Sequence, residues 1–191
     1  MLQYLVLIGA GVQMIGIVSY IKDMVRGNAK PNRISWLMWT IAPMIATAAA
    51  LTKGVTWAVL PVFTSGFGPL IVLIASFFSK DAYWKLETFD YLCGACSLLA
   101  LILWAITQEP LVAIVFAILS DAFAAVPTIL KAWKHPETEA AAPFASGVFS
   151  AVTAFFAIQH WSFAEYAFPA YLVLVNVTII FSIVRLRILK K

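Results

Sequence analysis

Three polar side chains stand near the middle of long apolar segments, where they could bind a solute or carry a proton. Asp121 lies in the segment LSDAFAAVPTIL, and Gln13 and Asn176 lie within a residue or two of the midpoints of two other apolar segments. A carboxyl group can bind and release a proton, and an amide can donate and accept hydrogen bonds. Because all three are expected at one depth, we interpret them as the lining of a shared cavity.

Asp121 is the most informative of these residues. A charged side chain at the centre of a bilayer costs about 2.5–3.5 kcal/mol on insertion scales, and no lysine or arginine lies in the middle of an apolar segment. The carboxyl group is therefore expected to face water in a cavity, to take up a proton, or to hydrogen-bond to Gln13 and Asn176. Such an acid is typical of a proton-coupled carrier; the alternative is a protonated acid that only holds helices together.

Small and polar residues form stripes along the apolar segments. In the first segment Gly9, Gln13, Gly16 and Tyr20 recur on one helical face. Such stripes let helices pack closely, and they also suit a polar lining. We therefore add Ser65 and Ser150 from other segments as candidate solute contacts, and we add Trp39 because its flat indole ring could contact a ring-bearing solute.

Prolines inside the apolar segments are candidate hinges. A proline within a helix removes one backbone hydrogen bond and clashes with the carbonyl group four residues earlier. Pro43 and Pro127 are the two candidate hinges, and Pro61 and Pro169 are expected to kink two further helices near their ends.

The sequence offers few components for catalysis. The two histidines, His135 and His160, fall in predicted loops at opposite ends, and no serine has a nearby base within an apolar segment. The motif CGAC brings Cys93 and Cys96 together, but small residues at this spacing are ordinary helix-packing material. We expect no enzyme activity, no metal site and no cofactor.

The elements that position these residues are predicted to be membrane-spanning helices. The chain has 191 residues, of which 63% are hydrophobic and 12% charged, and the mean hydropathy is +0.93. Soluble domains are far less apolar, and a spanning helix needs roughly 20 apolar residues. Seven segments fit an all-α integral membrane protein: 2–21, 34–51, 55–78, 91–107, 111–130, 142–158 and 163–184.

Charge placement predicts the orientation. Lys53 is the one basic residue on one side of the predicted spans, and all other lysines and arginines fall on the opposite side. Basic residues concentrate in cytoplasmic loops, so we expect an outside N-terminus and a cytoplasmic C-terminus in the cell (cytoplasmic) membrane. The basic residues are spread over short loops, which suits anionic lipid headgroups and does not indicate a nucleic-acid partner.

The seven segments suggest an internal repeat. A shift of 108 residues, which takes Gln13 onto Asp121, places the first three segments on the last three with matching loop lengths. The chain then divides into a first three-helix unit (1–79), a linker helix (80–109) and a second three-helix unit (110–191). An odd linker helix gives both units the same orientation, as in parallel transporter repeats.

This 3+1+3 plan resembles the SWEET and PQ-loop superfamily. The segment VPTILKAWKHPETEAAAPF (126–144) is similar to the signature loop of that family, in which a Pro-Gln pair ends a helix and a basic stretch leads to an acid. Pro127 matches the proline, and Thr128 replaces the glutamine. The first unit departs further from the signature, because Ser19 stands at the proline position.

The resemblance implies a carrier or facilitator with a pocket between the two units and rocking motions at helix prolines. Asn176 matches the asparagine that SWEET sugar carriers place in their last helix, but Gly68 stands at the partner position. Asp121 is similar in place to an acid of proton-coupled amino-acid exporters of the PQ-loop group. The small-molecule solute is left open, as is a homo-oligomeric assembly, and the alternative function is a receptor, sensor or subunit of a membrane complex.

Overall fold

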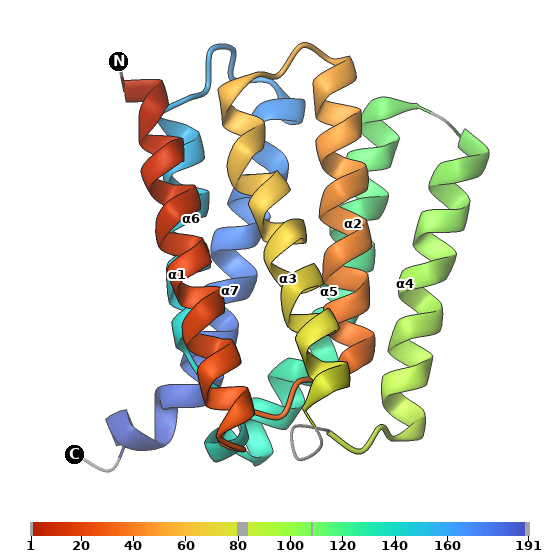
Figure 1. The fold of residues 1–191 in the computed structure, drawn as a ribbon. Coiled ribbons are helices and arrows are strands. Elements are labelled where there is room, and N and C mark those ends of the chain that lie inside the picture. The colour runs from red at the N-terminus through yellow and green to blue at the C-terminus, as the bar shows by residue number, and fades with distance from the viewer. Residues whose placement is uncertain (1, 80–83, 108, 190–191) are drawn as a thin grey trace.

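The computed structural model describes residues 2–79, 84–107 and 109–189, and within these ranges the side chains of Trp104 and of residues 186–189 are excepted. Every element in the described ranges is a helix (Figure 1). The elements are η1 (Leu2–Tyr4), α1 (Leu5–Val25), α2 (Arg33–Thr52), η2 (Trp57–Val59), α3 (Leu60–Phe78), α4 (Thr88–Thr107), α5 (Pro110–Lys134), η3 (Pro136–Thr138), α6 (Ala142–Phe155) and α7 (Phe163–Leu189). The prediction of an all-α fold is confirmed.

Six of the helices are long and apolar enough to cross a membrane, which fits a membrane-embedded protein. The exception is α6, which has 14 residues and a length of about 21 Å at 1.5 Å per residue. The hydrocarbon core of a bilayer is about 30 Å thick, so a full span over 142–158 is not confirmed. The helix ends early because Phe156 and Ala157 bond to carbonyl groups three residues back, and Glu165 accepts the next free backbone N–H groups, those of Gln159 and His160.

Six helices form a closed ring, and α4 lies outside it. Around the ring each helix packs against the next in the order α1, α3, α2, α5, α7 and α6, and α6 returns to α1. The helix α4 packs against α5 and, less extensively, against α2, and stands at the edge of the bundle in Figure 1. Exchanging α1, α2 and α3 for α5, α6 and α7 leaves this pattern of neighbours unchanged.

The contact between α1 and α6 depends on glycine. A Cβ atom at Gly9 would overlap with the side chain of Thr153, and one at Gly16 would overlap with Ser146 and approach the carbonyl oxygen of Ala142 to 2.9 Å. Small residues let helix backbones approach this closely. The stripe on α1 that the sequence indicates is therefore partly a packing surface, which joins the first three helices to the last three.

The start of α4 is held by a polar contact with the residue that caps α2. The side chain of Asn32 caps α2 by accepting from the backbone N–H groups of Ile34 and Ser35, and its amide donates to Asp90 of α4 over 2.8 Å. Asp90 also accepts from the backbone N–H of Glu87. These bonds start α4 three residues before the predicted boundary at Tyr91.

The basic residues gather at one end of the bundle, which we call the basic end. The loops after α1, α3 and α5 lie there together with the end of α7 (Figure 1), and Lys53 lies at the opposite end. Lys80, Lys190 and Lys191 lie outside the described residues.

We predict that Gly16→Ala destabilises the protein by about 1–3 kcal/mol, because the added methyl group forces α1 away from α6. Gly11→Ala is the matched control, since a Cβ atom there meets nothing within 4 Å and alanine favours helix more than glycine does. Thermal unfolding in detergent compares the two variants. Equal melting temperatures for both would show that the close approach of α1 and α6 contributes nothing.

Candidate functional site

A cavity lies at the centre of the ring and is lined by all six of its helices. Its volume is about 60 Å³, which accommodates a few water molecules. The described lining residues are Gln13, Ile17, Trp36, Trp39, Pro61, Ser65, Pro69, Asp121, Pro143, Phe144, Gly147, Leu172, Val175, Asn176 and Ile179. The structure therefore brings Gln13, Asp121 and Asn176 to one hollow, from α1, α5 and α7.

Asp121 is 2% exposed and has a different partner from the amides that the sequence suggested. The hydroxyl group of Tyr171 on α7 donates to its Oδ2 over 2.7 Å. Among the described residues no group donates to Oδ1, and no lysine, arginine or histidine lines the cavity. Oδ1 is thus available to accept a hydrogen bond from a molecule in the cavity.

The two amides each have one partner and one unused function. Gln13 accepts from the hydroxyl group of Thr64 over 2.7 Å, and Asn176 donates to the carbonyl oxygen of Leu172 over 2.7 Å. Within the described part of the chain, the Gln13 amide nitrogen and the Asn176 amide oxygen have no protein partner. Of the three alternatives for Asp121, a bond to these amides is the one that the structure does not show, because Gln13 is held by Thr64 and Asn176 by its own helix.

The other predicted contacts divide into two groups. Trp39 and Ser65 line the cavity, and the indole N–H of Trp39 donates to the backbone oxygen of Asp121 over 3.3 Å. Ser150 does not line it: this residue is 1% exposed and lies on the face of α6 that packs against Gly9. The glycines of α1 let that face of α6 pack against α1 and not on the described cavity lining, and a role of Ser150 as a solute contact stays a prediction.

The proposed hinges lie inside continuous helices. Pro43 is within α2, in contact distance of Gly66 on α3, and Pro127 is buried within α5. Pro61 occupies the first turn of α3, where a proline costs no helical hydrogen bond, so the predicted kink at this residue is wrong. Pro69 was missed; it lies inside α3 and on the cavity.

Aromatic rings connect the cavity to the basic end. The rings of Tyr20 and Trp36 are 4.8 Å apart, those of Trp36 and Trp39 are 5.5 Å apart, and those of Trp39 and Phe144 are 6.0 Å apart. Sequence reasoning did not include Phe144 and Tyr171 among the candidate residues. The 108-residue shift, which takes Trp36 onto Phe144, is a signal that could have found the first of these two.

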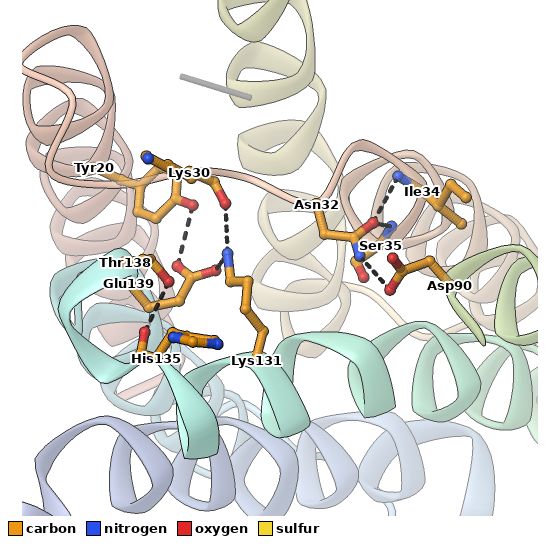
Figure 2. Close-up of polar contacts among 10 residues, drawn as sticks. All are labelled: Tyr20, Lys30, Asn32, Ile34, Ser35, Asp90, Lys131, His135, Thr138 and Glu139. Carbon is orange, nitrogen blue, oxygen red and sulfur yellow. Dashed lines mark hydrogen bonds and ion pairs between the residues drawn. The ribbon is translucent and has the colours of Figure 1, made fainter. Parts of the chain in front are cut away.

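A layer of polar groups lies beyond these rings, and we call it the polar layer: Tyr20, Lys30, Lys131 and Glu139. The hydroxyl group of Tyr20 donates to Glu139 over 3.1 Å, Lys131 forms an ion pair with the same carboxylate, and its ammonium group also donates to the backbone oxygen of Lys30 (Figure 2). The backbone N–H of Lys30 donates to the oxygen of Thr138 over 3.0 Å. The polar layer therefore joins the loop after α1 to the loop after α5.

The burial of Lys131 corrects the sequence interpretation. The helix α5 continues to Lys134, past the predicted boundary at residue 130, and the side chain of Lys131 is 1% exposed. Its ammonium group also lies 5.1 Å from the centre of the Trp84 ring. The sequence analysis places the basic residues of KAWKHPETE in a short loop that suits lipid headgroups, but both members of this ion pair lie inside the molecule.

The two cysteines are both free, Cys93 buried and Cys96 half-buried. No group of three potential metal ligands occurs among the described residues. Chemically, the arrangement can bind a small polar molecule and can hold a proton on Asp121.

Comparison with family models, with curated proteins and with solved structures found no match for this chain. The function is therefore inferred from the geometry of the cavity and of the polar layer.

We predict that Glu139→Gln destabilises the protein by about 3–5 kcal/mol, because the buried ammonium group of Lys131 loses its counter-charge. Lys131→Met combined with Glu139→Gln should recover much of the loss, which a double-mutant cycle of melting temperatures measures. Glu137→Gln is the control within the same loop, since its side chain is 69% exposed. A loss of stability in Glu137→Gln as large as that in Glu139→Gln would contradict the role of Glu139 as the counter-charge of Lys131.

Proposed function

We propose that this protein is a membrane carrier or facilitator that passes a small polar solute through the central cavity. The observation that supports this proposal is a set of polar atoms around one hollow that have no partner among the described residues: Oδ1 of Asp121, the amide nitrogen of Gln13 and the amide oxygen of Asn176. Unpaired polar groups buried in an apolar bundle are costly. A bound solute or water that satisfies them explains why the bundle retains them.

The architecture that we propose is the SWEET-like 3+1+3 plan, with units at 1–79 and 110–191 and the linker helix at 80–109. In support, the cavity lies where the two sets of three helices meet, through the contacts of α1 with α6 and of α2 with α5. These two contacts exchange with each other under the 108-residue shift. Transporters with internal repeats place their solute sites at the repeat interface.

Alternating access requires a barrier on each side of the site, and the two ends of this bundle differ in chemistry. At the basic end the polar layer joins two loops through an ion pair and hydrogen bonds. At the opposite end the bundle is packed by small apolar residues, among them Ala49, Ala113 and Ala164. In our proposal the polar layer opens as the units rock at Pro43 and Pro127.

Asp121 is the proposed proton-binding residue. It is buried, no cationic side chain lies among the described lining residues, and the one hydrogen bond that its carboxyl group receives from a described residue comes from Tyr171, a titratable group. Proton uptake would neutralise the carboxyl group whenever no solute compensates it. We place the protein in the cytoplasmic membrane with the basic end inside, as the distribution of lysine and arginine favours.

The first experiment is solute counterflow in proteoliposomes, with a labelled panel of glucose, glycine, choline and nicotinamide. We expect exchange of at least one solute, and we expect Asp121→Asn to slow that exchange roughly tenfold, because a hydrogen bond to a charged group is worth about 1.5–3 kcal/mol. Gly11→Ala serves as the control for reconstitution. Folded protein that exchanges no member of the panel would favour a receptor or a subunit of a membrane complex.

The second experiment measures opening at the polar layer. In a Cys93→Ser/Cys96→Ser background, a cysteine in place of Ser65 reports access to the cavity by its rate of reaction with a charged thiosulfonate reagent in detergent. Glu139→Gln should raise this rate several-fold, because it removes the ion pair that holds the two loops together, whereas Glu137→Gln should not. An unchanged rate would mean that the polar layer does not control access.

A further inference from the structure

The net charge of the cavity wall indicates which class of solute it suits. Asp121 is the one charged group among its described lining residues. Two basic groups at the basic end are engaged elsewhere: Lys131 pairs with Glu139, and Arg33 bonds to Ser76 and lies 4.6 Å from the centre of the Phe77 ring. Because no cationic side chain lines the cavity among the described residues, neutralising the carboxylate there is left to a proton or a ligand.

The unpartnered atoms of the described lining residues include two hydrogen-bond acceptors and two donors. Oδ1 of Asp121 and the amide oxygen of Asn176 lack donors within the described part of the chain, and the amide nitrogen of Gln13 and the indole nitrogen of Trp36 lack acceptors there. The two acceptors include the one carboxylate of the described lining, so negative charge dominates the set. A ligand that brings N–H donors or a positive charge complements this set.

Aromatic rings complete the wall. Trp39 meets Trp36 and Phe144 in nearly perpendicular arrangements, with interplanar angles of 77° and 76°, and all three line the cavity. Indole and phenyl rings attract cations through their negative faces, and such rings around a hollow bind ammonium groups. The same rings offer apolar contact to the body of the ligand.

We infer that the cavity binds an organic cation, an ammonium compound with an apolar or aromatic body, whose charge pairs with Asp121 while its body contacts Trp39 and Phe144. This inference rests on the proposed function and names the class of solute. A zwitterion such as an amino acid suits the site less well, because no described cationic group lines the cavity to pair with its carboxylate. A ligand larger than a few water molecules enters as the helices part at one end, as a carrier cycle requires.

The test is thermal stabilisation of the full chain in maltoside micelles without choline-headed lipid. Three ligands share one shape and differ in charge: choline is a cation, 3,3-dimethylbutan-1-ol is its neutral isostere, and glycine betaine carries the same ammonium group with a carboxylate. A second matched pair is benzylammonium and benzyl alcohol. Because a ligand of the folded state raises the melting temperature according to its affinity and concentration, we expect a rise with choline or benzylammonium and none with their neutral partners or betaine.

Asp121→Asn keeps the shape of the side chain and removes its charge, and it should weaken the apparent affinity for the stabilising cation at least about tenfold. Glu165→Gln is the matched control: this buried acid of α7 accepts two backbone N–H groups and does not line the cavity. The wild-type comparison of cation and neutral isostere stands even where a variant folds poorly.

Equal stabilisation by cation and neutral isostere, or the absence of stabilisation by both cations, would overturn the inference. Retention of cation binding in Asp121→Asn would overturn the assigned role of the carboxylate. The carrier proposal fails by a separate result, the exchange of no solute of the counterflow panel. Exchange of glucose or nicotinamide without cation binding would support the carrier proposal and overturn the inference that the solute is an organic cation.

Discussion

A polar group inside an apolar helix bundle must find its partners within the bundle, and this constraint shapes the whole molecule. Around the cavity, Asp121 takes a hydrogen bond from Tyr171, and Gln13 takes one from Thr64. These bonds fix the rotation of two pairs of helices, α5 against α7 and α1 against α3. The close contact of α1 with α6 follows the same logic, because Gly9 and Gly16 admit hydroxyl-bearing residues that would be costly against lipid.

The two ends of the bundle are held by interactions that differ in how strongly they depend on direction. Hydrogen bonds and an ion pair in the polar layer have directions and fixed partners, so they break together once the loops separate. Alanine packing at the opposite end has no preferred direction and tolerates small sliding of helices. A bundle built in this way has one end suited to abrupt release and one suited to gradual adjustment.

Much of this arrangement could be predicted from sequence, and the failures have physical causes. The convergence of Gln13, Asp121 and Asn176 follows from their depth and from the cost of facing lipid. Their partners do not, because the rotation of each helix depends on packing that single-segment patterns do not contain. Lys131 was misplaced for a related reason: the acid that lets it stay buried, Glu139, comes from a loop beyond the end of its helix.

The backbone bond between Lys30 and Thr138 has a consequence for how the molecule can evolve. The two residues are 108 positions apart, so under the repeat that we propose the bond joins equivalent points of the two units, on the axis that would relate them. An assembly of two identical chains would form it once in each direction. Here it forms in one direction, and the carbonyl group of Lys30 is taken by the Lys131 side chain instead. With both units in one polypeptide, a mutation can strengthen or weaken the contact made by one of these two loops. The equivalent position in the other loop then stays unchanged.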